Sequence, residues 1–201
     1  MIFRKYILYF LVFIGFAAYG QEQDSITVSY KRVSTYTTYN IAPDDSANVV
    51  KLVLRGKKLG KIPAEIFKLT TLEYLDLSGN KLDIIPKEIG QLKNLKVLIL
   101  ENNKLEALPE EIYQLKNLQV LRVGKNNIFY VSSKINQLKQ LMILDMWDNN
   151  VAEFPEEIGD LEQTLRVLDL RSVSMNDDQQ YQITKLLPNT KVLMDVSCNC
   201  N

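Results

Sequence analysis

Histidine is absent from this chain of 201 residues. Histidine is the usual general base near neutral pH, a frequent zinc ligand, and the partner that activates serine and cysteine nucleophiles. Its absence removes these catalytic and metal-binding arrangements. We therefore predict a protein that is not an enzyme and that needs no cofactor or metal.

Cysteine is scarce, because only Cys198 and Cys200 occur and both lie at the C-terminus. Two thiolates supply half of a tetrahedral zinc site, and neither histidine nor a third cysteine completes it. In an exported protein two interpretations stay open. The cysteines form a local disulfide or a tethered tail, or they bridge two chains.

Net charge is also lacking, since 24 Lys and Arg residues balance 24 Asp and Glu residues. No global field draws the chain to nucleic acid or to an acidic membrane surface. Tryptophan occurs once, as Trp147 in the run LDMWDNN. A position between Asp145 and Asp148 is unusual for a core side chain.

Long apolar runs are missing except in residues 1–20. There a basic pair, Arg4-Lys5, precedes an apolar run and the small-x-small sequence that ends at Gly20. This order predicts a secretory signal peptide that is cleaved near Gly20. The run is shorter than the ~20 residues of a spanning helix, so we expect no membrane span after cleavage. We expect an exported protein, in the periplasm, on the cell surface or secreted.

What the chain does contain is a repeat of 23 residues, read for example from Leu72 as LEYLDLSGNKLDIIPKEIGQLKN. Leu72, Leu75 and Leu77 alternate as a short strand that turns one face inward. One such unit cannot bury its apolar face alone, so stacked neighbours must create the core. The six units span 49–71, 72–94, 95–117, 118–140, 141–164 and the divergent 165–190.

This pattern, LxxLxLxxNxLxxIPxxIxxLxx, resembles the short repeat class of the leucine-rich repeat family, and exported bacterial members in particular. The resemblance covers about 150 residues. It implies an α/β fold, a right-handed solenoid curved like a horseshoe. A parallel sheet should line the concave side, with short helical or irregular segments on the convex side.

One asparagine recurs in four of the units, where a short amide can satisfy backbone groups of a turn. The resemblance implies an internal ladder, so these residues are predicted to be structural rather than part of a binding site. They are Asn80, Asn103, Asn126 and Asn149.

A proline recurs later in the units, and Ser132 takes its place in the fourth. Proline at a first helical position, with a glutamate two residues later, predicts a short helical return segment. These prolines are Pro63, Pro86, Pro109 and Pro155.

The two ends of the stack need caps. We expect residues 21–48 to form the N-terminal cap. At the other end the sequence predicts a helix near Gln179 to Leu187, capped by Asp177 or Asp178. Residues 191–201 should form a terminal strand, up to Val196, and a cysteine-containing tail.

Strand alternation identifies the side chains that leave the core on the concave side. They include tryptophan, tyrosine and arginine, which dominate binding hot spots. We predict that this face recognises a protein or peptide, and that Trp147 stacks on Arg171, contacts the partner, or does both. The predicted partner-binding residues are Tyr74, Asp76, Ile99, Glu101, Arg122, Asp145, Trp147, Asp169 and Arg171.

Two alternatives remain. Ile84, Ala107 and Tyr130 share a loop position, beside Phe129. They are expected to pack against the next loop, or else to form an apolar rim through which a scaffold or cytosolic-type signalling protein associates.

The remoter alternative is a hydrolase that uses Asp145 and Asp169. The rows place these aspartates on neighbouring strands, about 5 Å apart, as in retaining glycosidases. The oligomeric state stays open.

Overall fold

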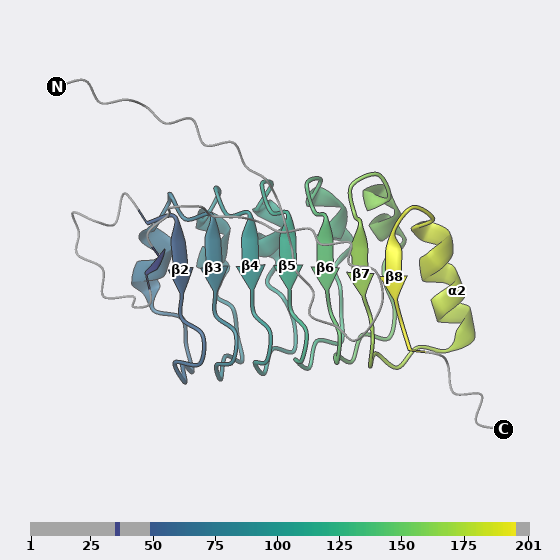
Figure 1. The fold of residues 1–201 in the computed structure, drawn as a ribbon, viewed down its shortest axis with the longest axis horizontal. Coiled ribbons are helices and arrows are strands. Elements are labelled where there is room, and N and C mark those ends of the chain that lie inside the picture. The colour runs from purple at the N-terminus through teal and green to yellow at the C-terminus, as the bar shows by residue number, and fades with distance from the viewer. Residues whose placement is uncertain (1–34, 37–48, 196–201) are drawn as a thin grey trace, which may run out of the picture. The chain divides into compact units, whose positions relative to one another are not determined.

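The computed structural model describes residues 35–36 and 49–195 (Figure 1). The predicted signal peptide, nearly all of the predicted N-terminal cap, and the two cysteines lie outside these residues. The strands form one parallel sheet whose spatial order follows the chain. They are β1 (Thr35–Tyr36), β2 (Lys51–Val53), β3 (Tyr74–Asp76), β4 (Val97–Ile99), β5 (Val120–Arg122), β6 (Ile143–Asp145), β7 (Val167–Asp169) and β8 (Lys191–Leu193).

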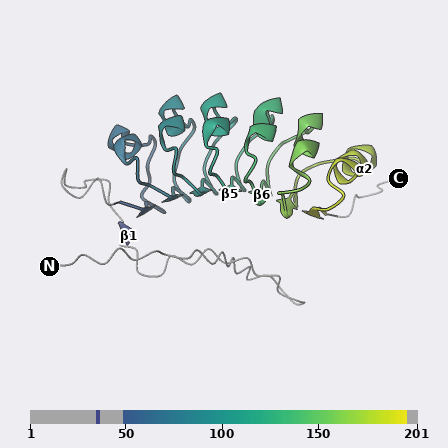
Figure 2. The ribbon, with the colours of Figure 1, turned by 90° about the horizontal axis from the view of Figure 1, so that it is seen from above.

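Each strand from β2 to β6 is followed by a short 3-10 helix on the other side of the solenoid (Figure 2). Between them lies the core, to which every coil contributes; Leu72, Leu75 and Leu77 in one coil are completely buried. The predicted solenoid, with a parallel sheet and helical convex segments, is therefore confirmed. The 3-10 helices are η1 (Ala64–Lys68), η2 (Lys87–Gln91), η3 (Glu110–Gln114), η4 (Ser133–Gln137) and η5 (Glu156–Leu161).

The recurring asparagines bond across successive coils. The Asn126 side-chain amide donates to the carbonyls of Val123 in its own coil, at 2.8 Å, and of Leu100 in the preceding coil, at 3.0 Å. Its oxygen accepts a hydrogen bond from the Leu105 N–H of the preceding coil at 3.0 Å. Asn80, Asn103 and Asn149 make the same three contacts in their coils.

The turn before this asparagine position requires a left-handed backbone in all six coils. Glycine, which adopts positive φ without steric cost, stands there in the first two coils. Other residues replace it in the later coils. The six residues are Gly56, Gly79, Asn102, Lys125, Asp148 and Ser172, with φ between 52° and 68°.

The recurring prolines lie one residue before the helical position that was predicted for them. Each proline precedes its 3-10 helix as the N-cap, for example Pro86 before η2 with φ −69° and ψ 152°. The extended ψ keeps proline outside the helix proper, while its fixed φ directs the chain into it. Ser132 has almost the same geometry, with φ −67° and ψ 146°, and its hydroxyl accepts a bond from the Lys134 N–H.

The C-terminal helix begins earlier than the sequence suggested. Helix α2 spans Asp177–Leu186, and its cap is Asn176 rather than Asp177 or Asp178. Asn176 and Gln179 form a reciprocal capping box, with bonds of 2.9 and 2.8 Å. This box satisfies the backbone N–H groups of both Asn176 and Gln179. The helix therefore begins directly after Asn176. The last strand, β8, ends at Leu193, before Val196.

Candidate functional site

The concave face consists of side chains that the parallel register aligns in rows. Asp76, Ile99, Arg122, Asp145 and Asp169 are direct partners on successive strands from β3 to β7. We call these five residues the central row. The structure thus brings together side chains that are at least 23 positions apart in the sequence.

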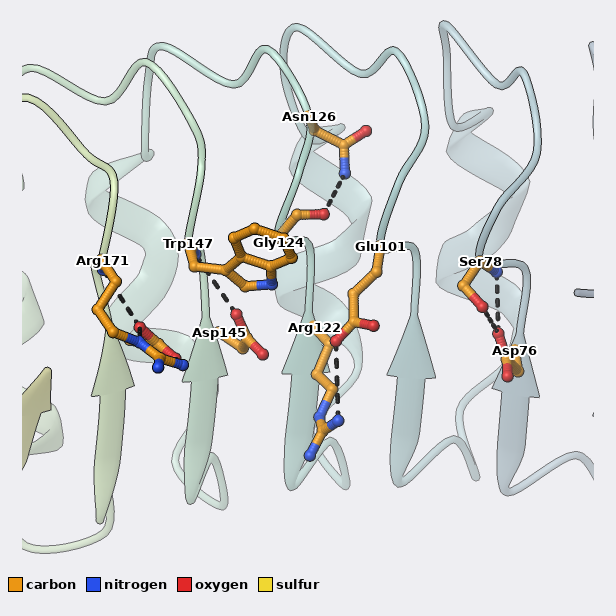
Figure 3. Close-up of polar contacts among 10 residues, drawn as sticks. Asp76, Ser78, Glu101, Arg122, Gly124, Asn126, Asp145, Trp147 and Arg171 are labelled. Carbon is orange, nitrogen blue, oxygen red and sulfur yellow. Dashed lines mark hydrogen bonds and ion pairs between the residues drawn. The ribbon is translucent and has the colours of Figure 1, made fainter. Parts of the chain in front are cut away.

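The three aspartates of the central row are buried rather than exposed. Asp76, Asp145 and Asp169 retain 7%, 3% and 0% of their accessible surface. Buried carboxylates need hydrogen-bond donors, and each aspartate accepts one from the backbone N–H two residues later. This local bond folds the carboxylate back against the end of its strand (Figure 3).

The remaining donors differ from one aspartate to the next. Ser78 donates its hydroxyl to Asp76 at 2.6 Å. Arg171 donates two guanidinium bonds to Asp169, of 2.9 and 2.6 Å, in the fork geometry that fits a carboxylate. The bond to Asp169 raises the pKa of the Arg171 guanidinium. Arg171 is therefore held by a neighbour within its own turn.

Asp145 lies in the most acidic part of the row. Its backbone donor, the Trp147 N–H, is 3.4 Å away. Burial, followed by the nearby carboxyl groups of Asp169 and Glu101, raises the pKa of Asp145 to about 7, although Arg122 lowers it. The carboxyl group of Asp145 therefore holds a proton more readily than an ordinary aspartate does.

Glu101 and Arg122 face each other beside this aspartate. Their closest charged atoms, Arg122 Nη1 and Glu101 Oε1, are 3.7 Å apart, and both side chains are partly exposed. Burial raises the pKa of Glu101, while Arg122 lowers it. The pair offers a partner one group of each charge.

The indole of Trp147 lies over the backbone of Gly124 on the preceding strand's turn (Figure 3). A methyl group added to Gly124 would come within 2.2 Å of the indole Cδ1. The expected stacking of Trp147 on Arg171 is wrong, because the indole occupies the space above Gly124 and Arg171 binds Asp169. The sequence analysis did not include Gly124 among the site residues. The signal that could have identified it is a glycine at the position equivalent to Trp147 in the preceding coil, where only a residue without a side chain leaves room for the indole.

The row at the start of the strands is apolar in its middle. Val97, Val120 and Ile143 retain 3%, 3% and 1% of their surface. At the end of the same row, Lys51 Nζ lies 4.6 Å from the ring centre of Tyr74, a cation–π contact. Burial raises the pKa of Tyr74. Of the predicted residues, Tyr74, Ile99, Glu101, Arg122, Trp147 and Arg171 are partly exposed, and the three aspartates are buried.

A second surface feature lies in the loops after the asparagines. Ile84, Phe129 and Tyr130 are 68%, 58% and 56% exposed. The expectation that these loop residues pack against the next loop is therefore wrong. Ala107, which is also exposed, occupies the same loop in the coil between those of Ile84 and Tyr130. Together these four residues form an apolar rim.

The proposed hydrolase pair does lie on paired strands, since Asp145 and Asp169 are in register. Asp169 is fully buried and both of its oxygens accept bonds from Arg171. A carboxylate held in this way cannot approach a substrate as nucleophile or base. The geometry argues against hydrolysis at this pair.

Within residues 49–195, no helix is long and apolar enough to cross a membrane. The sequence matches a family model described as a leucine-rich repeat region over residues 87–201 and another described as a leucine rich repeat over residues 47–105. A search of curated proteins finds no significant match.

Solved structures of similar fold come from bacteria and plants. A leucine-rich repeat protein of Leptospira interrogans is 36% identical, with a TM-score of 0.65, over 67% of this chain and 34% of that one. Internalin C2 of Listeria monocytogenes is 23% identical, with a TM-score of 0.65, over 74% and 62%. A complex of BIR3 and SERK2 from Arabidopsis thaliana is 32% identical, with a TM-score of 0.51, over 55% and 62%. The match spans less than two thirds of the length of each of these chains.

Proposed function

Since this chain belongs to the leucine-rich repeat family, we propose that it is a non-catalytic module that binds a protein or peptide through the concave face of its sheet. The observation that carries the proposal is the arrangement around Trp147. Its indole is anchored over Gly124 yet partly exposed, and it lies on the same part of the face as the Glu101 and Arg122 side chains (Figure 3). An aromatic anchor beside paired charges is typical of a binding hot spot.

The comparisons support a macromolecular partner. One similar structure is a complex of two proteins, BIR3 and SERK2, and another contains PEPR1 with AtPEP1. The latter is 25% identical over 74% of this chain, with a TM-score of 0.58. Neutral overall charge is consistent with recognition by a local surface rather than by a general field.

Site-specific photocrosslinking tests the proposal. A photoreactive phenylalanine analogue replaces Ile99 in the central row or, as matched control, Ile84 in the apolar rim. We expect a defined adduct from the Ile99 position in the native cell extract, lost when Trp147→Ala and Arg122→Ala are added. Adducts that form only from the Ile84 position, or that persist in the double variant, contradict the concave-face proposal.

The apolar rim supports a second candidate, association of a scaffold protein through its loops. Its specific observation is the exposure of Ile84, Phe129 and Tyr130. Replacing all three by serine should leave the concave adduct unchanged if the first proposal holds. If it abolishes partner capture while the fold is retained, the rim is the functional surface.

We also propose that the protein is exported, to the periplasm, the cell surface or the medium. The supporting pattern is the basic, apolar and small-x-small order of residues 1–20. N-terminal sequencing of the cell fractions should find a chain that starts near Gln21 outside the cytoplasm. An intact N-terminus in the cytoplasm contradicts export and favours the cytosolic-type alternative.

A further inference from the structure

Glu101, Arg122, Asp145 and Arg171 lie along the concave face between the turn after β4 and the turn after β7 (Figure 3), and Asp169 is the register partner of Asp145 on β7. We call these five charged residues the acid–arginine cluster. Three carry carboxyl groups and two carry guanidinium groups. When all five are ionised, the cluster has one excess negative charge.

The two guanidinium groups already interact with two of the carboxyl groups. Arg171 grips Asp169 with bonds of 2.9 and 2.6 Å, and Arg122 lies 3.7 Å from Glu101. Asp145 accepts a hydrogen bond of 3.4 Å from a neutral donor, the Trp147 N–H, and its carboxyl group also shares a hydrogen bond with the Glu101 side chain. The excess charge therefore falls on this carboxyl pair, in which Asp145 is the more deeply buried member.

The position of Asp145 makes that charge costly. It is 3% exposed and in register with Asp169 on the next strand. Adjacent strands are about 4.8 Å apart, so the two carboxyl groups repel each other when both are ionised. Glu101 adds to this repulsion, and Arg122 reduces it without cancelling it.

We propose that the acid–arginine cluster is a one-proton switch within the concave face, neutral with a proton on Asp145 in mildly acidic solution and negative in mildly alkaline solution. The switch deepens the proposed function and rests on it for its biological role. A partner that presents a cation beside Trp147 should bind more tightly in the negative form. The charged groups that face Asp145 are Glu101 from the turn after β4, Arg122 on β5, Asp169 on β7 and Arg171 from the turn after β7.

The first test needs no partner. Carboxyl carbons of the full-length protein labelled with ¹³C at aspartate are followed by NMR from pH 4 to 9. We expect one aspartate to titrate with a midpoint near pH 7, where burial and the neighbouring carboxyl groups place Asp145. The signal should disappear in Asp145→Asn.

Two variants separate the switch from a merely structural role. Glu101→Gln removes a repelling carboxylate and should lower the midpoint, whereas Arg122→Gln removes the neighbouring cation and should raise it. Asp76→Asn is the matched control, because Asp76 occupies the same row and is buried, but is bonded by Ser78. This control should leave the midpoint unchanged.

The stability of the chain provides a second readout. The folded protein retains a proton on Asp145 up to about pH 7, whereas the unfolded chain loses it near its ordinary value of 3.8. Wild type therefore loses stability relative to Asp145→Asn as pH rises between these values. The urea midpoint of wild type should therefore fall relative to that of Asp145→Asn from pH 4 to 7. Above pH 7 the difference between the two midpoints should stay constant.

A midpoint below pH 5 for every aspartate overturns the switch. It is also overturned if Glu101→Gln and Arg122→Gln leave the near-neutral midpoint in place. These results are independent of the crosslinking experiment, because they concern the protein alone. If Asp145 titrates below pH 5 and the crosslinking from position 99 succeeds, the switch is rejected and the proposed function is retained.

Discussion

The Tyr113 hydroxyl lies in the apolar core, where 1% of the residue remains exposed. Burial raises the pKa of this hydroxyl to about 12. It accepts a hydrogen bond of 3.3 Å from the Ser132 N–H. Every other coil with a 3-10 helix from η1 to η5 has proline at that position, and proline has no N–H. The serine thus supplies the donor that the buried tyrosine needs.

We predict that Ser132→Pro destabilises the protein by about 1–3 kcal/mol, the cost of leaving a buried polar group unsatisfied. The backbone itself accepts proline, since Ser132 has φ −67°. Urea unfolding should give this loss. Adding Tyr113→Phe should recover most of it, and Ser132→Ala, which keeps the N–H, should cost less. A loss unaffected by Tyr113→Phe would point to another cause.

The contact between Trp147 and Gly124 leads to a second prediction. Gly124→Ala places a methyl group 2.2 Å from the indole Cδ1, so the ring must move. We expect a changed indole fluorescence spectrum and a loss of about 1–3 kcal/mol, typical of overpacking. In a Trp147→Ala background the same substitution should be nearly neutral. An unchanged spectrum in the single variant would contradict the stacking.

At the scale of the element, the backbone conformation of the turn after each strand determines which residues fit there without strain. At the position before the asparagine, the left-handed residue is glycine in the coils of β2 and β3, but Lys125 has φ 56° and Asp148 has φ 52°. A non-glycine residue in this conformation stores strain, typically ~1–3 kcal/mol. At this one position, the later coils therefore hold residues that are less suited to the backbone than glycine is.

Lys125→Gly should stabilise the protein by about 1 kcal/mol, because relief of strain exceeds the extra entropy that glycine gives to the unfolded chain. Thermal unfolding would measure the gain. Lys104→Gly is the matched control, because Lys104 is an exposed loop residue that is not among those of positive φ. It should be destabilising. Equal effects of the two substitutions would show that the left-handed conformation carries no strain.

The sequence predicted the elements that depend on periodicity and missed those that depend on a particular side chain. The leucine spacing located every strand from β2 to β7, because only that spacing turns one face inward. The start of α2 was misplaced because a reciprocal bond between Asn176 and Gln179, rather than acidity alone, selects the cap. Strand alternation correctly predicted that Asp145 and Trp147 point to the concave side. It could not predict that Asp145 is buried or that the Trp147 indole lies on Gly124, because both depend on neighbours in other coils.

At the scale of the whole molecule, stability is transmitted from coil to coil. Asn126 bonds to Leu100, Leu105 and Val123, and so joins two adjacent coils in the middle of the stack. In a linear array the coupling between neighbours keeps unfolding cooperative. A break in the centre should therefore affect more than its own coil.

We predict that Asn126→Ala costs about 3 kcal/mol or more, since several buried backbone groups lose their partner. Its urea transition should also broaden, with a lower m-value, as the two halves unfold less cooperatively. Asn176→Ala, which removes only the cap of α2, should cost ~1 kcal/mol without broadening. A sharp transition for Asn126→Ala would contradict coupling through the ladder.

The asparagine bonds run in one direction along the chain. Each asparagine satisfies backbone groups of its own coil and of the coil before it, as Asn80 does for Leu54 and Leu59. During synthesis from the N-terminus, the turn of each of the first four coils is completed only when the next coil supplies its asparagine. A ribosomal stall after any of these four coils therefore leaves the same kind of open turn. The sixth coil, where Val173 replaces the asparagine and Asp195 accepts from the Ser172 N–H, ends that dependence.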